Sequence, residues 1–194
     1  METIVPRWEW RTFAASFGDA DRRFSQLPPG NVQESDELYL LSPHFDANVK
    51  IRDQLMDIKA LQQVNRDGLE QWRPVMKGGF PLRAADVAAV CAALRVAPLS
   101  AREAYSPEQL QAELTHPSRG VHAVPVRKRR QRYRVGECLA EMTALTADGH
   151  PTRTVAIEFD DPAAVVTAVQ HMGLARYENV SYPRALKRLL GWPA

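Results

Sequence analysis

Val126-Arg-Lys-Arg-Arg-Gln-Arg-Tyr-Arg-Val135 is the stretch that decides the fold, because six of its eight inner residues are cationic while a valine closes each end. The β-branched ends favour a strand over a solvated tail. Successive side chains of a strand point to opposite faces, so Arg127 and Arg129 share one face. The other face carries four cations: Lys128, Arg130, Arg132 and Arg134. We therefore expect a strand that is basic on either face.

The sign of the charge reverses directly after this strand. Between residues 136 and 161 a single cation, Arg153, faces six acids: Glu137, Glu141, Asp148, Glu158, Asp160 and Asp161. A cationic strand beside anionic ones can hold a polyphosphate together with its divalent metal. Two alternatives stay open for the basic run, a solvated loop or a nucleic-acid patch.

Composition bounds the class of protein. A chain of 194 residues with 45% apolar and 25% charged residues predicts one globular domain over residues 1–194, with room for an insertion. A net charge of +2 argues against nucleic acid as the primary partner. The only two cysteines, Cys91 and Cys138, lack metal-type spacing, and no apolar run approaches the roughly 20 residues that span a bilayer. We expect a cytoplasmic protein with no membrane association.

Local patterns predict an α+β fold. Residues 5–13 alternate charged and aromatic side chains, as a half-buried strand does. Asn65-Arg66-Asp67-Gly68 and Asp148-Gly149 are hairpin turns, and helices are expected to begin after Ser106 and Asp161. We predict an eight-stranded antiparallel β-barrel, forming a tunnel, with helices packed on its outside and a helical insertion around residues 82–118.

The order of charged strands resembles the CYTH superfamily, the triphosphate tunnel metalloenzymes, over nearly the whole chain. The segments that carry the resemblance are Glu9-Trp-Arg11, Lys50-Ile-Arg52, Asp57-Ile-Lys59, Arg73, Arg127 to Arg134, Glu137 to Glu141, Ile157-Glu-Phe159 and Tyr177-Glu-Asn-Val-Ser-Tyr-Pro183. The resemblance implies a tunnel in which acidic side chains hold Mg²⁺ or Mn²⁺ and opposing cations grip a triphosphate. Members of the superfamily include inorganic triphosphatases, thiamine triphosphatases and class IV adenylate cyclases.

Two positions depart from the family pattern. The opening motif Glu-x-Glu-x-Lys reads Arg7-Trp-Glu9-Trp-Arg11, so a cation replaces the first carboxylate. On the last strand Glu-x-Glu shrinks to Ala156-Ile-Glu158. Hard divalent cations need several oxygen ligands, so these losses weaken a metal site without removing the anion site. Arg7 is expected to lend its charge directly to a phosphate.

The resemblance assigns roles residue by residue. The expected metal ligands are Glu9, Glu141 and Glu158, and Glu141, the expected catalytic residue, either holds the metal or positions the attacking water. The expected phosphate ligands are Arg7, Arg11, Lys50, Arg52, Lys59, Arg73, Lys128, Arg130 and Arg132. The competing interpretation is that these acids are only salt-bridge partners of neighbouring arginines.

Three functions follow from this assignment. The first is metal-assisted hydrolysis of inorganic triphosphate, polyphosphate or an organic triphosphate. The second is a non-catalytic module that binds polyphosphate or a nucleotide and has lost its metal chemistry, as Arg7 and Ala156 suggest. The third is adenylate cyclase activity, for which the sequence offers no nucleobase pocket. A homodimer is compatible with each function. Acyl-transfer triads and P-loops are not found in the sequence.

Overall fold

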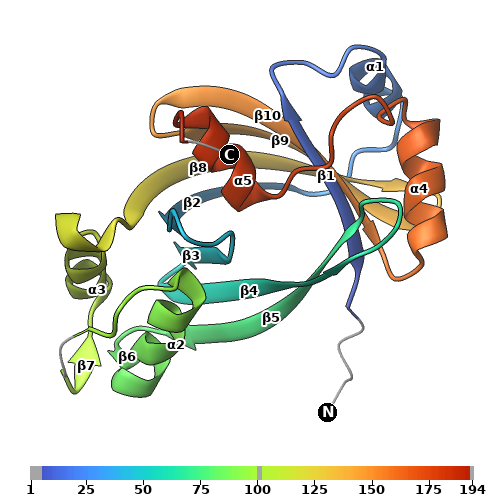
Figure 1. The fold of residues 1–194 in the computed structure, drawn as a ribbon. Helices are drawn as coiled ribbons and strands as arrows, with labels where there is room; N and C mark the ends of the chain where they lie inside the picture. Colours follow the sequence, from blue (N-terminus) through green and yellow to red (C-terminus); the bar gives the residue numbers. More distant parts are fainter. Residues whose placement is uncertain (1–5, 100–101, 193–194) are drawn as a thin grey trace. The chain divides into compact units, whose positions relative to one another are not determined.

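The computed structural model describes residues 6–99 and 102–192, and it has an α+β fold (Figure 1). The strands of its main sheet are β1 (Trp8–Ala14), β2 (Val32–Leu41), β3 (Asn48–Arg52), β4 (Leu55–Val64), β5 (Glu70–Gly79), β8 (His122–Val135), β9 (Cys138–Ala147) and β10 (His150–Phe159). They are hydrogen-bonded in the order β1-β10-β9-β8-β2-β3-β4-β5, and antiparallel pairing of β1 with β5 closes the ring. The predicted eight-stranded antiparallel ring is confirmed.

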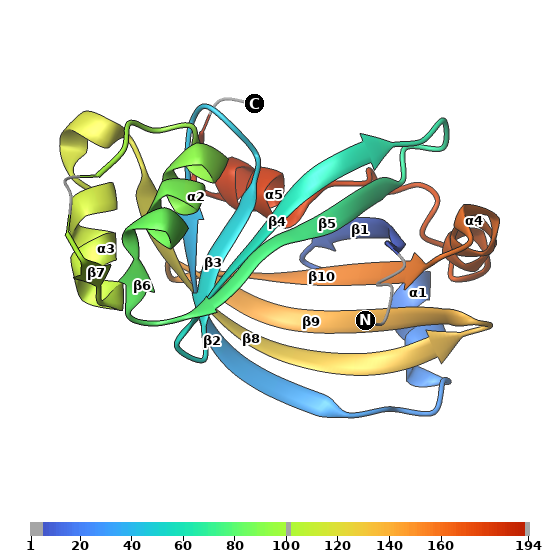
Figure 2. The same cartoon turned by 90° about the horizontal axis from the view of Figure 1, so that it is seen from below.

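The remaining elements are mostly short helices. They are α1 (Asp19–Ser25), β6 (Leu82–Arg83), α2 (Ala84–Leu94), β7 (Ala104–Tyr105), α3 (Pro107–Leu114), a 3₁₀ turn (Pro117–Arg119), α4 (Pro162–His171) and α5 (Tyr182–Leu189). The segment expected to hold a helical insertion therefore carries α2, α3 and the small β6–β7 pair (Figure 2). Among the described residues, no helix is both long enough and apolar enough to cross a membrane.

The turn and the helix starts that the sequence predicts at Asp148, Ser106 and Asp161 are present in the structure. Asp148 and Gly149 both have positive φ, 47° and 82°, which the tight β9–β10 hairpin requires. Ser106 accepts a hydrogen bond from the backbone of Gln109 at the start of α3. Asp161 does the same for Ala163 at 2.9 Å, so α4 begins where the sequence predicts.

Two compact units make up the chain: a first unit of residues 1–35, 61–73 and 127–181, and a second unit of residues 36–60, 74–126 and 182–194. The single domain expected over residues 1–194 stays a prediction.

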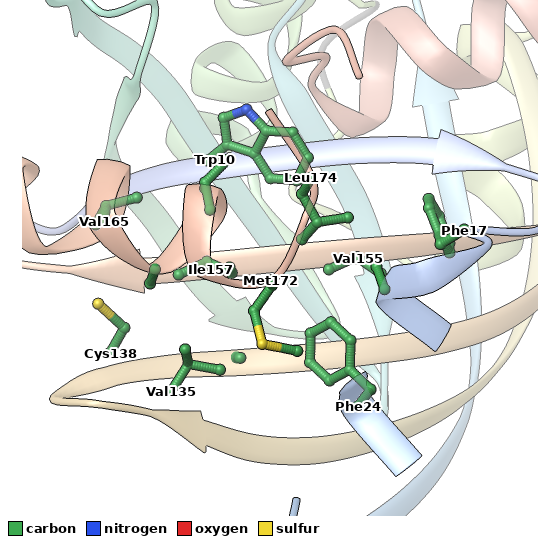
Figure 3. Packing of buried hydrophobic residues seen from close by; sticks show 14 of the residues in the cluster. Trp10, Phe17, Phe24, Val135, Cys138, Val155, Ile157, Val165, Met172 and Leu174 are labelled. Atoms are coloured by element: carbon green, nitrogen blue, oxygen red, sulfur yellow. The ribbon is translucent and has the colours of Figure 1, made fainter. Parts of the chain in front are cut away.

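The core of the first unit lies under α4, which packs on β1, β9 and β10. Trp10, Ile157 and Met172 are at most 5% exposed and pack together here (Figure 3). Because strand residues alternate, burial of Trp10 and Ile157 on this face turns their neighbours Arg11 and Glu158 to the opposite face. The apolar core thereby positions the charged side chains.

The second unit has its own core, built by α2 and α3 against β3 and β4. Val49 and Ile58 are fully buried there together with Val90 and Leu110. The register of β3 and β4 places Lys50 opposite Asp57, and Asn48 opposite Lys59. Lys50, Arg52 and Lys59 therefore share the strand face that points away from this core.

Candidate anion-binding site

Three glutamates stand side by side on adjacent strands of the first unit. Glu9 on β1 lies directly opposite Glu158 on β10 and directly opposite Glu70 on β5. Directly opposed residues of antiparallel strands point to the same face, with their Cβ atoms about 5 Å apart. Like charges in such a row repel one another, so the row needs cations close by. We call this side of the sheet the charged face; it carries Glu9, Arg11, Glu70, Glu141 and Glu158.

Arg11 is the cation at the centre of this face. Its Nε donates to Glu9 Oε1 at 2.7 Å, and its Nη2 donates to Glu141 Oε1 at 3.0 Å. Glu141 lies on β9, with β10 between it and Arg11, and the β10 residue that faces both is Ala156. Because Ala156 carries only a methyl group, the two long side chains meet above it. Only 9% of the Arg11 side chain is exposed.

The backbone of β1 is held in place at Arg11. Arg11 N–H donates to Asn179 Oδ1, and Arg11 C=O accepts from Val180 N–H, both at 2.7 Å. Both backbone groups of Arg11 thus point away from β10, so Arg11 and Ala156 form the non-hydrogen-bonded type of pair, in which side chains lie closer. Asn179 also donates to Gly68 C=O at 2.6 Å. The segment after α4 therefore ties β1 to the β4–β5 turn.

Arg130 on β8 brings a second guanidinium to Glu141. Its Nε lies 3.1 Å from Glu141 Oε2, but the pair does not have the geometry of a hydrogen bond, so this buried donor has no hydrogen-bond acceptor among residues 6–99 and 102–192. Burial alone would raise the pKa of Glu141, yet the charges of Arg11 and Arg130 outweigh burial and hold that pKa below its ordinary value. Glu141 is therefore a carboxylate at neutral pH.

The outer end of the acidic row is paired with Arg7. Arg7 Nη1 donates to Glu158 Oε1 at 2.9 Å, and the two side chains are 51% and 37% exposed. A pair this exposed contributes little to stability, about 0 to 1 kcal/mol. At the other end of the row Glu70 is buried and accepts a hydrogen bond from the Trp72 indole at 3.0 Å.

The second unit holds a separate cluster around Glu37. The Glu37 side chain is fully buried, and its oxygens lie 3.0 Å from Lys50 Nζ and 3.6 Å from Arg52 Nη1. Burial lowers the pKa of Lys50, while the nearby charge of Glu37 opposes that shift. Tyr39 lies below the Lys50 ammonium, 5.6 Å from ring centroid to nitrogen.

The other predicted phosphate ligands do not all lie on the charged face. Lys128 is buried, and its charge acts on Glu141, so it belongs to the charged face. Arg132 lies on the same side of β8 by alternation, is exposed, and donates to Gln33 at 3.2 Å. Lys59 is exposed in the second unit. Arg73 is also exposed, and alternation along β5 turns it away from the face that Glu70 occupies.

Sequence reasoning missed three residues of these clusters. Glu70 lies on β5 and Glu37 on β2. Their neighbours are known only from the pairing of Glu9 with Glu70 and the ion pair of Lys50 with Glu37. Asn179 lies in the segment Tyr177 to Pro183 that carries part of the family resemblance. The sequence shows charged residues in these segments, but it does not show the strand register that brings them next to one another.

The donor set on the charged face does not fit the Mg²⁺ or Mn²⁺ expected from the sequence resemblance. Within residues 6–99 and 102–192, no group of three or more His, Cys, Asp or Glu side chains is arranged to hold a metal ion. Arginine contacts each of the expected ligands: Arg11 contacts Glu9 and Glu141, and Arg7 contacts Glu158. A metal would have to displace these guanidinium groups.

No protein-family model and no curated protein matches the chain. Solved structures do match it. HpAC1 from Hippeastrum is 11% identical, the alignment covers 97% of each chain, and the TM-score is 0.53. Its structure is described as that of an adenylyl cyclase candidate that reveals a dominant triphosphatase activity. A conserved hypothetical protein from Pyrococcus furiosus is 14% identical, with 91% of this chain and 98% of that chain covered and a TM-score of 0.51.

These likenesses define the class of fold. The chain has the fold of the CYTH superfamily, an antiparallel ring of eight strands with helices added to it, and the resemblance predicted from the sequence is confirmed in that respect.

Proposed function

We propose that the chain binds a linear triphosphate or polyphosphate on the charged face of its first unit, and that it does so as a binding module. Lys128, Arg130 and Arg132 extend along one side of β8, and the Arg130–Glu141 ion pair places that side on the charged face. Guanidinium groups recognise phosphate oxygens through charge-assisted, often bidentate, hydrogen bonds.

The observation that carries the proposal is the Nε donor of Arg130. It is buried and makes no hydrogen bond with any residue that the structure describes, although it lies 3.1 Å from a Glu141 oxygen. The donor gains the charge attraction of Glu141 but not a well-aligned hydrogen bond. A phosphate oxygen at this position would satisfy it, and Arg132, whose hydrogen-bond acceptor is the neutral Gln33, would bind the next phosphate.

Calorimetric titration with tripolyphosphate tests the proposal. Arg130→Ala should weaken binding about tenfold or more, because a charge-assisted contact is worth about 1.5 to 3 kcal/mol. Arg127→Ala is the matched control: it removes the same group from the same strand, but from the opposite, exposed face. Equal affinities of the two variants would remove β8 from the site.

Hydrolysis of the bound phosphate is the second candidate. The row Glu158–Glu9–Glu70 favours it, since carboxylates gathered on one face are the oxygen ligands that divalent metals take. The triphosphatase activity described for HpAC1 supports it as well. Release of phosphate from tripolyphosphate with Mg²⁺ or Mn²⁺, lost in Glu158→Gln while binding is kept, would establish this function in place of the binding module.

A further inference from the structure

We infer that Arg11 takes the place of a resident metal ion: its guanidinium supplies the positive charge between Glu9 and Glu141, so phosphate binding on the charged face requires no divalent cation. This inference rests on the proposed function for its phosphate part. Its metal part stands on the contacts of Arg11 alone.

The first argument is the coordination of Arg11. Three nitrogens of its guanidinium reach three different acceptors: Glu9 at 2.7 Å, Glu141 at 3.0 Å and the Thr154 hydroxyl at 3.4 Å. The acceptors come from three adjacent strands, β1, β9 and β10. A single buried cation thus gathers oxygen ligands from across the sheet, as a bound ion would.

The second argument is the space that Ala156 provides. Ala156 is 3% exposed and faces Arg11 on one side and Glu141 on the other. Neighbouring strands lie about 4.8 Å apart, so Arg11 and Glu141 reach toward each other over two such spacings. Any longer side chain at position 156 would stand between them. The small residue that removes one carboxylate from this face also makes room for the guanidinium.

The third argument is the charge balance. The carboxylates of Glu9 and Glu141 are matched by the guanidinium groups of Arg11 and Arg130, which lie within 3.1 Å of them. A divalent ion needs several free oxygens and would be repelled by two fixed cations at contact distance. The lowered pKa of Glu141 agrees with strong pairing to arginine.

The test is a titration of the full chain with Mn²⁺ alone, followed by calorimetry and by the electron paramagnetic resonance signal of free Mn²⁺. The wild type should bind no stoichiometric Mn²⁺. Arg11→Met keeps an unbranched side chain but removes the cation that Glu9 and Glu141 share, so it should bind Mn²⁺ more tightly than the wild type although Arg130 still contacts Glu141. Arg11→Lys is the matched control: it keeps one positive charge and should bind none.

A second measurement does not depend on the folding of any variant. Wild-type affinity for tripolyphosphate should change by less than about twofold in excess chelator, because the fixed cations remain in place. Stoichiometric Mn²⁺ binding by the wild type, or loss of tripolyphosphate binding in chelator, would overturn the inference. A folded Arg11→Met that binds no Mn²⁺ would overturn it too. If the wild type binds neither Mn²⁺ nor tripolyphosphate while Arg11→Met binds Mn²⁺, the proposed function fails. The inference that Arg11 replaces a metal ion then still stands.

Discussion

Arg11 on β1 and Glu141 on β9 are joined by a 3.0 Å hydrogen bond although β10 lies between their strands. The two side chains meet above the methyl group of Ala156, so their contact depends on the small size of that residue. The arrangement explains how an acidic face in the first unit remains stable: its carboxylates are shared among guanidinium groups from neighbouring strands.

Ala156→Leu should break this contact. The larger side chain fills the space in which Arg11 and Glu141 meet, which costs about 1 to 3 kcal/mol of overpacking and leaves both charges poorly paired. We expect a loss of at least about 2 kcal/mol in the free energy of unfolding, measured by urea denaturation. Ala144→Leu is the control, since Ala144 lies on the adjacent strand β9 and is exposed. Equal stability of the two variants would show that the space above Ala156 is not needed.

Glu141 should make stability depend on pH in the acid range. Its pKa is below the ordinary value in the folded protein, so the unfolded chain binds the proton more readily. The stabilisation is complete above the unfolded pKa, about 4.3, and is lost as the pH falls through the lower folded pKa. Glu141→Gln cannot titrate in this way and should be less stable than the wild type at pH 7 by about 2 kcal/mol, the contribution of a charged hydrogen bond.

The check is the difference in unfolding free energy between the wild type and Glu141→Gln, followed from pH 7 downward. It should be constant at neutral pH and shrink below about pH 4.3. Glu137→Gln, in the exposed β8–β9 turn, should show no comparable difference at neutral pH. A difference that stays constant throughout the acid range would argue against the pairing of Glu141 with Arg11 and Arg130.

In the second unit, removing the charge of Glu37 should be costly. Glu37→Gln leaves the buried ammonium of Lys50 without its carboxylate, which is expected to cost about 3 kcal/mol. Adding Lys50→Met removes the unpaired charge as well and should restore part of the loss. Thermal unfolding of the single and double variants measures this coupling. Asp36→Asn, at the exposed neighbouring position, is the control.

Much of the fold could be predicted because its signals are local. The alternation in Val126 to Val135, the turn at Asp148-Gly149 and the caps at Ser106 and Asp161 each depend on a few neighbouring residues, and each forms as expected. The division of the chain into two compact units has no such local signal, because each unit collects segments from distant parts of the sequence.

The candidate site could be predicted only in part, because its contacts depend on strand register. The charged residues near Glu9 were identified, but its neighbour Glu70 was not, since a shift of one residue would turn Glu70 to the other face. The same alternation separates Arg73 from Glu70. The bridge from Arg11 to Glu141 also requires the register of two strand pairs at once.

Affinity for phosphates should depend on chain length, salt and guanidinium geometry together. Tripolyphosphate should bind more tightly than pyrophosphate, because each added phosphate meets another cation of β8, and higher salt should weaken both by screening. Arg130→Lys should recover only part of the affinity lost in Arg130→Ala, because an ammonium keeps the charge but not the planar, bidentate donor set. Calorimetry at several salt concentrations measures all three effects. Full recovery by lysine would mean that Arg130 acts through charge alone, and an affinity insensitive to salt would place the bound phosphate away from the charged face.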